Sequence, residues 1–415
     1  MNDAARTRAT IERLGHQGDG IALGPIYAPR TLPGEVVTGT VEGQTLTDIR
    51  IEEPSDHRVQ APCRHYKSCG GCQLQHASDV FVADWKMEIV ETALRSRGLD
   101  AEFRPILTSP ARSRRRATLS AKRTKKGAMA GFHGRASDVI TSIPDCQLLD
   151  PDLIAGIPVA EELAVIGASR KAPLSVTLTT SDVGLDVLVR NGKPLDGPLR
   201  IELGRMIERH KLARLTWDDE PMGMEHAPTQ KFGPARVSPP PGAFLQATHE
   251  GEAALVEAVQ EIVGKARRVA DLFAGCGTFS LPLAGGAEVL AVEGDRQMML
   301  ALEQGWRKAP GLKKVTTETR DLFRNPLLAE DLTPFGAAFD AVVIDPPRAG
   351  AEAQIAELAR AKTPSIAYVS CNPITFARDA EVLVAAGYAL NWVQVVDQFR
   401  WSAHTELVAS LTYSR

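Results

Sequence analysis

The stretch Asp271-Leu272-Phe273-Ala274-Gly275-Cys276-Gly277-Thr278 decides the fold class of this 415-residue chain. The apolar run 268–273 predicts a buried strand, and the two glycines after it predict a loop in which backbone N–H groups closely approach a ligand. Glu293 ends the next apolar run, where a carboxylate can hold a ribose hydroxyl. The octapeptide therefore indicates a ligand site at the carboxyl edge of an α/β sheet.

The composition of this loop narrows the class of ligand. A dinucleotide fingerprint needs glycine at position 280, where this chain has Ser280, and Asp271 places an acidic group before the glycines. These features favour a ligand with a cationic group and no pyrophosphate, and D-x-F-x-G-x-G is typical of class I S-adenosylmethionine (SAM) methyltransferases. The alternative is a tight turn in a doubly wound domain without a ligand. We assign no chemistry to Cys276.

Repeated β-α units surround the octapeptide. Apolar runs separated by helical patterns predict a parallel sheet covered on both faces, and they lie at 268–273, 289–293, 341–345 and 366–370. Two last runs, 392–396 and 406–412, have only a short connection, so we expect an antiparallel pair to close the sheet. The C-terminal half is thus predicted to be a class I (Rossmann-like) α/β domain.

The segments before this domain have other patterns. Residues 9–55 alternate short apolar runs with Gly and Pro, which predicts a small antiparallel barrel. Residues 77–98 have helical spacing, and residues 112–215 alternate in a β-like pattern. The turn-rich stretch 238–242 marks a domain boundary.

Three short motifs indicate the reaction. Asp345-Pro346-Pro347-Arg348 and Ser370-Cys371-Asn372-Pro373 each end an apolar run, and His404-Thr405-Glu406 begins the last one. A thiol and a carboxylate at one crevice suit methylation of uracil, in which a thiolate adds to carbon 6, carbon 5 accepts the methyl group, and a base removes the carbon 5 proton. We expect Cys371 to be the nucleophile and Glu406 the base. The structural alternatives are a buried strand-end cysteine and an exposed strand charge.

Four of the six cysteines lie in the first 150 residues: Cys63, Cys69, Cys72 and Cys146. Four thiolates fit either a [4Fe–4S] cluster or a structural zinc ion. Zinc ribbons usually carry two C-x2-C pairs, whereas this chain has C-x5-C-x2-C and one remote cysteine, which favours the cluster. The spacing is not C-x3-C-x2-C, so we expect a structural or RNA-positioning role and no radical chemistry.

The positive charge is concentrated although the net charge is −3. Eight basic residues crowd positions 112–126, which predicts local contacts to phosphates of a nucleic acid, and the alternative is a solvated hairpin. The N-terminal residues have no apolar core of a secretory signal, and no apolar run is long enough to cross a bilayer. We expect a cytoplasmic protein.

The motifs in this order resemble those of RNA uridine-5 methyltransferases, specifically the iron–sulfur branch that modifies 23S ribosomal RNA. The resemblance spans nearly the whole chain and includes an N-terminal TRAM-like barrel, the cysteine cluster, D-L-F-x-G-x-G, D-P-P-R, S-C-N-P and the final H-x-E. It implies SAM and a [4Fe–4S] cluster as cofactors, the four cysteines as cluster ligands, and the catalytic roles given above. It also implies cofactor contacts by Gln246, Phe273, Thr278, Glu293, Asp321 and Asp345, although Thr278 and Asp321 stand where some members carry Asn.

The resemblance also implies how RNA binds and how the chain is divided. The target uridine would be splayed out of its stack, with Phe244 stacking on it and with Arg114, Arg115 and Arg116 among the residues that hold flanking phosphates. The expected domains are a barrel (1–55), a central α+β iron–sulfur domain (56–76 and 109–235) and a methyltransferase domain (77–108 and 236–415). Nothing demands more than a monomer.

Three other functions compete with this interpretation. An RNA-binding iron–sulfur protein with an inactive methyltransferase domain would bind RNA without methyl transfer. A DNA cytosine-5 methyltransferase normally presents its cysteine in a Pro-Cys-Gln loop, which this chain lacks. A tRNA uridine-5 methyltransferase is closer, but that branch usually lacks the barrel and the cysteine cluster.

Overall fold

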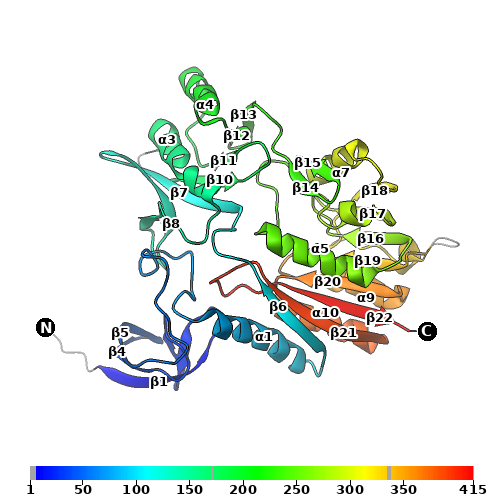
Figure 1. The fold of residues 1–415 in the computed structure, drawn as a ribbon, viewed down its shortest axis with the longest axis horizontal. Helices are drawn as coiled ribbons and strands as arrows, with labels where there is room; N and C mark the ends of the chain where they lie inside the picture. The colour runs from blue at the N-terminus through cyan, green and yellow to red at the C-terminus, as the bar shows by residue number, and fades with distance from the viewer. Residues whose placement is uncertain (1–5, 170–171, 334–337, 415) are drawn as a thin grey trace.

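A computed structural model describes residues 6–169, 172–333 and 338–414. The N-terminal strands form a closed barrel in the order β1-β2-β3-β5-β4, which confirms the expected barrel (Figure 1). Its strands are β1 (Thr7–Leu14), β2 (Gly20–Ala22), β3 (Ile26–Ala28), β4 (Val36–Glu42) and β5 (Thr45–Glu53). A small apolar core that includes Ile11, Val37 and Leu46 fills it.

The C-terminal half forms an eight-stranded sheet in the order β18-β17-β16-β19-β20-β22-β21-β6. The four predicted runs correspond to β16 (Arg268–Leu272), β17 (Glu288–Glu293), β19 (Ala341–Ile344) and β20 (Ser365–Ser370). A further strand that was not predicted, β18 (Val315–Thr319), lies beside β17, and all five pair in parallel. The predicted antiparallel pair is β21 (Tyr388–Asp397) and β22 (Leu407–Tyr413). β22 also pairs antiparallel with β20. The Rossmann-like prediction is confirmed.

Apolar cores cover both faces of this sheet. One core joins the sheet to α9 (Glu352–Ala361), α10 (Pro373–Ala385) and α8 (Ala329–Leu332). The other joins it to α5 (His249–Val263), α6 (Ser280–Leu283), α7 (Arg296–Lys308) and the small hairpin of β14 (Gln230–Phe232) and β15 (Ala235–Val237). Strands buried on both faces explain why their sequences are continuous apolar runs.

A segment from the first quarter of the chain completes the C-terminal sheet. Helix α1 (Asp79–Arg95) contacts α10, and β6 (Glu102–Thr108) pairs in parallel with β21 at the edge of the sheet. The side chain of Ser78 caps α1 by accepting a hydrogen bond from the Phe81 N–H. The placement of α1 and β6 supports our proposed assignment of residues 77–108 to the methyltransferase domain.

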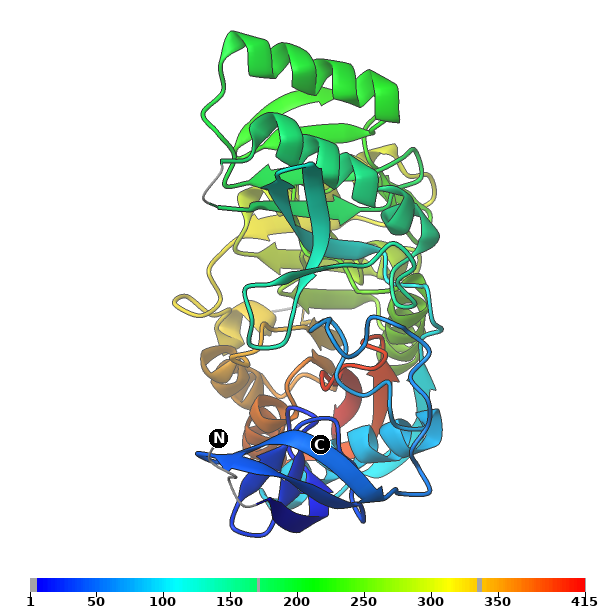
Figure 2. The same cartoon turned by 90° about the vertical axis from the view of Figure 1, so that its left-hand side faces the viewer.

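A seven-stranded sheet in the order β13-β12-β11-β10-β7-β8-β9 occupies the middle of the chain. Its strands are β7 (Arg116–Thr124), β8 (Gly127–His133), β9 (Ile140–Ser142), β10 (Leu174–Thr179), β11 (Asp186–Arg190), β12 (Arg214–Trp217) and β13 (Glu220–Met224). α2 (Pro151–Ala155), α3 (Ile157–Gly167) and α4 (Gly197–His210) accompany it. Figure 2 shows the barrel at one end of the molecule and α4 at the other. Among the described residues, no helix is long and apolar enough to span a membrane.

Candidate active site

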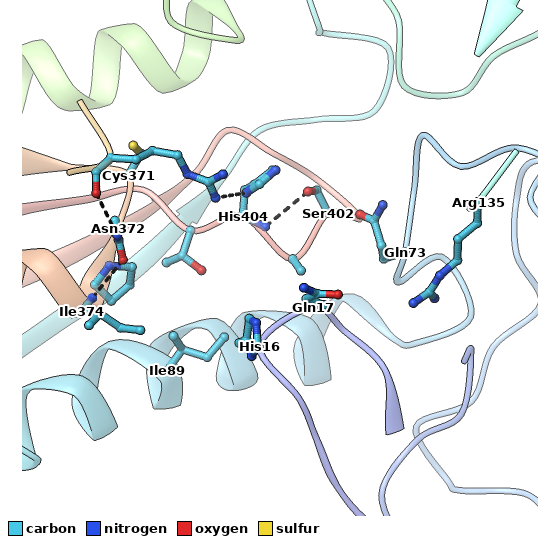
Figure 3. A pocket seen from close by; sticks show the side chains of 14 residues that line it. His16, Gln17, Gln73, Ile89, Arg135, Cys371, Asn372, Ile374, Ser402 and His404 are labelled. Atoms are coloured by element: carbon cyan, nitrogen blue, oxygen red, sulfur yellow. Dashed lines mark hydrogen bonds between the residues drawn. The ribbon is translucent and has the colours of Figure 1, made fainter. Parts of the chain in front are cut away.

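A cavity of about 540 Å³ opens between the barrel, the cysteine segment and the carboxyl edge of the eight-stranded sheet (Figure 3). Its walls come from segments far apart in the sequence: His16, Gln17, Gln73, Ile89, Arg135, Arg348, Cys371, Asn372, Pro373, Ile374, Ser402, Ala403, His404 and Thr405. An ion pair between Asp19 of the β1–β2 turn and Arg135 of the central domain closes one side. Three parts of the chain therefore build one pocket.

Cys371 lies between the end of β20 and the start of α10, and it is one of the residues that line the cavity. Asn372 caps α10 through its side chain and donates its amide N–H to the Arg348 carbonyl at 2.8 Å, which joins the two motif loops. Burial, together with the nearby carboxylates of Glu406 and Asp345, raises the pKa of Cys371 to about 11, and Arg348 partly opposes this shift. In the ligand-free chain the thiol is therefore protonated at neutral pH.

This raised pKa predicts how Cys371 reacts with an alkylating reagent. Because the thiolate is the reactive form and the pKa lies near 11, its fraction increases about tenfold per pH unit below that value. We expect the iodoacetamide rate at Cys371 to rise about tenfold per unit between about pH 7 and 10. Mass spectrometry of the Cys371 peptide measures this rate. A rate that is constant across this range would contradict the raised pKa.

Glu406 faces Cys371 across the sheet edge. Ser370 pairs with Leu407 in the β20–β22 ladder, so Cys371 and Glu406 lie directly beyond the last pair. The Glu406 side chain is buried, and this burial raises its pKa well above the ordinary value, with Asp345 adding to the shift. The Gln398 amide donates to the Glu406 carboxylate at 3.2 Å and favours the ionised form. The thiol of Cys371 and the carboxylate of Glu406 thus share one edge of the sheet.

The predicted cofactor loop has backbone conformations that favour glycine at its two glycine positions. Gly275 and Gly277 both have positive φ, and a Cβ at Gly277 would lie 2.8 Å from Leu302. The Gly275 N–H donates to the Glu293 carboxylate at 3.1 Å, which confirms that the loop and the end of β17 meet. Phe273 also has positive φ, and its ring lies 5.4 Å from that of Phe323.

Carboxylates gather beside this loop. Asp271 is fully buried, and it accepts a hydrogen bond from the Ser280 hydroxyl at 2.5 Å while its other oxygen has no partner. Burial raises the pKa of Asp271 to about 7, and Glu293 adds to the shift. Burial likewise raises the pKa of Asp345 to about 7, with Asp271 and Glu293 adding to it. A cation bound here would relieve the repulsion among these groups.

The remaining predicted cofactor residues differ in burial and in their hydrogen bonds. Gln246 is buried and donates to the Asp345 carboxylate at 3.4 Å. Asp321 is exposed and accepts the Phe323 N–H at 3.0 Å, which fixes the loop after β18. Thr278 is half-buried, and its cofactor contact stays a prediction. Gln398 lies between the cofactor side and Glu406 and was not predicted, because no motif marks it.

Comparison with known proteins shows similarity both in sequence and in fold. Residues 308–413 match the family model described as tRNA (Uracil-5-)-methyltransferase. An uncharacterized RNA methyltransferase of Rhizobium meliloti (strain 1021) is 45% identical over 411 residues, which cover 97% of this chain and 98% of the relative. The 23S rRNA (uracil(1939)-C(5))-methyltransferase of Shewanella sp. (strain ANA-3) is 31% identical over 439 residues, covering 98% and 95%. This chain belongs to the RNA uracil-5 methyltransferase family.

The fold of the whole enzyme is also found in a solved structure. The tRNA (uracil-54, C5)-methyltransferase of Pyrococcus abyssi, in complex with S-adenosyl-L-homocysteine, matches with a TM-score of 0.73 at 22% identity, covering 98% of this chain and 100% of that one. The match covers nearly the whole chain, so a barrel by itself does not exclude a tRNA enzyme. The fold alone does not separate rRNA from tRNA uracil-5 methyltransferases.

The basic strip of this methyltransferase divides into two parts. Lys122, Arg123, Lys125 and Lys126 are exposed on the β7–β8 hairpin, as a phosphate contact requires. Arg115, by contrast, is buried: it forms an ion pair with Glu252 and donates to the Gln246 carbonyl at 2.9 Å. Its predicted contact with RNA is therefore wrong, since its guanidinium holds the central domain against α5.

Arg114 and Arg116, on either side of Arg115, are half-buried. Arg114 donates to the Arg116 carbonyl at 3.1 Å, and Arg116 donates to the Gly242 carbonyl at 3.2 Å. Their RNA contacts stay predictions. Phe244 projects from the same region with 60% of its surface exposed, as a residue that stacks on a base requires.

The four clustered cysteines of the methyltransferase form no disulfide bond. The N–H groups of Gly71 and Leu148 donate to the sulfurs of Cys69 and Cys146 at 3.3 and 3.5 Å. Within the described ranges, no three His, Cys, Asp or Glu side chains are grouped so that they could hold a metal ion. The iron–sulfur cluster stays a prediction.

Proposed function

We propose that this enzyme methylates carbon 5 of a uridine in 23S rRNA, with SAM as methyl donor, Cys371 as nucleophile and Glu406 as base. The β20–β22 register carries the proposal, since it sets Cys371, which lines the cavity, opposite the buried Glu406. The choice of rRNA rests on the Shewanella relative, which matches over nearly the full length of both chains.

The geometry supports a separate chemical role for each of these residues. Cys371 loses its thiol proton to water in the cavity that it lines, the thiolate adds to carbon 6 of uracil, and the electrons of the ring double bond move to the oxygen on carbon 4. SAM supplies an electrophilic methyl group to carbon 5. Glu406 then takes the proton from carbon 5, the ring double bond forms again, and the Cys371 thiolate leaves. Arg348, whose charge favours the Cys371 thiolate, supports the first step.

The residues at the cofactor loop fit SAM by charge. The unpartnered carboxylate oxygen of Asp271 and the raised pKa of Asp345 suit a cationic sulfonium, and the Glu293 carboxylate at the end of β17 would accept a hydrogen bond from a ribose hydroxyl. Gln246, Phe273, Thr278 and Asp321 would complete the binding site. The uridine reaches Cys371 only if it leaves its stack, and Phe244 is the proposed stacking residue.

The product tests this proposal directly. We expect 5-methyluridine in unmodified 23S rRNA transcribed in vitro after incubation with the enzyme and SAM, detected by nuclease digestion and mass spectrometry. An in vitro tRNA transcript serves as the second substrate. 5-Methyluridine in the tRNA alone would contradict the rRNA assignment, and a methyl group on another base would contradict the reaction.

We further propose that Cys63, Cys69, Cys72 and Cys146 hold a [4Fe–4S] cluster. The donors are all thiols, and backbone N–H groups point at two of the sulfurs, as is typical around iron–sulfur clusters. The cysteine segment reaches the active site because the N–H groups of Gln73 and Leu74 both donate to the Trp401 carbonyl, at 2.8 and 3.0 Å. The cluster would therefore hold the loop between β21 and β22 in place.

The colour of the purified protein tests the cluster. We expect broad visible absorbance and about four iron atoms per chain after anaerobic purification, both lost when Cys69 and Cys72 are changed to Ser. Metal analysis and absorbance spectra measure this. A colourless protein with one zinc ion per chain would contradict it.

A further inference from the structure

Gln398 connects the cofactor side of the site with Glu406. It follows β21, and its side chain is buried with 1% of the residue surface exposed. The Ala247 N–H donates to its Oε1 at 2.7 Å. Its Nε2 donates to Gln246 Oε1 at 2.6 Å and to Glu406 Oε2 at 3.2 Å. Every polar atom of this amide therefore has a partner.

These contacts fix which way the amide points. A backbone N–H can only donate, so the Gln398 oxygen must face Ala247 and its nitrogen must face Glu406. Gln246 continues the series, since its own nitrogen donates to Asp345 Oδ2 at 3.4 Å. Two amides thus link the carboxylate on the cofactor side to the carboxylate beside Cys371.

The surroundings hold Gln398 in this position. Next to it, Asp397 accepts a hydrogen bond from Lys86 of α1 at 2.5 Å, and both partners are buried. On the opposite side, a Cβ at Gly251 would lie 2.6 Å from the Gln398 Cβ, so only glycine leaves room for it. Arg115 fixes the other end, because it binds the carbonyls of Gln246 and Ala247. The amide has little freedom to turn away from Glu406.

We infer that Gln398 is a positioning residue that aims the Glu406 carboxylate at the carbon 5 proton and stabilises its ionised form. This inference rests on the proposed function. It concerns one step only: removal of the carbon 5 proton by Glu406, with return of the electron pair to the ring double bond and departure of Cys371. The earlier transfer of the methyl group does not need Gln398, so the two steps should separate in a Gln398 variant.

Two substitutions remove the donor in different ways. Gln398→Leu deletes all three hydrogen bonds at similar volume. Gln398→Glu keeps an oxygen for Ala247 and sets a second carboxyl beside Glu406. A second negative charge disfavours ionisation of Glu406, so the fraction in the basic form falls at a given pH and recovers as the pH rises.

The experiment compares these variants with wild type, Glu406→Gln and a matched control. Gln394→Leu is the control, since Gln394 lies on β21, the strand that Gln398 follows, and its amide donates to the Pro105 carbonyl at 3.1 Å, on the side of β6. Each protein is incubated with methyl-labelled SAM and the transcript, 23S rRNA or tRNA, that wild type methylates. Denaturing electrophoresis measures the methylated RNA–protein adduct, and free methylated RNA measures turnover.

In Gln398→Leu we expect turnover to fall about ten- to hundredfold, the size expected for a lost hydrogen bond to a charged group, while methylated adduct accumulates. In Gln398→Glu we expect the rising limb of turnover against pH to move to higher pH. Gln394→Leu should behave as wild type. Thermal unfolding shows whether each variant is folded, and if Gln398→Leu is not, the pH profile of Gln398→Glu alone decides.

Two results would overturn the inference: wild-type turnover and pH profile without adduct in every Gln398 variant that folds, or loss of the first methyl transfer in folded variants. If the proposed function itself is wrong, the result for Glu406→Gln differs: this variant would form no adduct and would keep its turnover.

Discussion

Cys371→Ala is expected to lower methyl transfer by about 10⁴-fold or more, because uracil carbon 5 accepts a methyl group only after a nucleophile has added at carbon 6. Cys371 lines the cavity between the motif loops and no other described cysteine lines it, so no second thiol can replace it. Methyl incorporation into RNA from labelled SAM measures the loss.

The control for this variant is ligand binding. Calorimetry should give SAM and RNA affinities close to those of wild type, because the Cys371 side chain is small and holds neither the Asn372 cap nor the Arg348 carbonyl. Turnover within tenfold of wild type would exclude the covalent mechanism.

Glu406→Gln is expected to stop the reaction after methyl transfer and to leave RNA covalently bound to the protein. The amide cannot take the carbon 5 proton, so Cys371 is not expelled and the adduct survives denaturing electrophoresis with the methyl label in it. General base catalysis contributes about 10²–10⁴-fold, which sets the expected fall in turnover.

Two controls make this result specific. The adduct should disappear in Glu406→Gln combined with Cys371→Ala. Glu381→Gln changes an exposed glutamate of α10 that pairs with Arg97 on the surface, and it should behave as wild type. An adduct that persists without Cys371 would mean that another residue is the nucleophile.

Much of the fold could be predicted because its strands are buried on both faces. β16, β17, β19 and β20 appear as apolar runs of four to six residues, and each motif loop follows directly from the end of one of them. The edge strand β6 could not be predicted from pattern, because its pairing with β21 joins segments whose contact Gln394–Pro105 spans 289 positions. Local periodicity carries no information about such a partner.

The site could be predicted only where residue type alone indicates chemistry. Cys371 and Glu406 belong to short motifs, whereas Gln398 is a single amide whose role comes entirely from its neighbours in space. For Arg115, a positive charge within a basic run indicated an RNA contact. In the structure its guanidinium instead forms an ion pair with Glu252, from a helix far away in the sequence. The type of a charged residue does not show whether its side chain is buried in the folded protein.

The ion pair between Lys86 and Asp397 also has a consequence during synthesis. The two residues are 311 positions apart, so at about 5–20 residues per second α1 leaves the ribosome roughly 15–60 s before its anionic partner exists. During that interval the apolar side of α1, including Trp85 and Val90, has no sheet to cover. Lys86 lies among these side chains, and we expect its ammonium group to keep the nascent helix hydrated and to oppose self-association until the last strands are made. Once Asp397 has been made, the same ammonium group forms the ion pair that joins α1 to the end of β21.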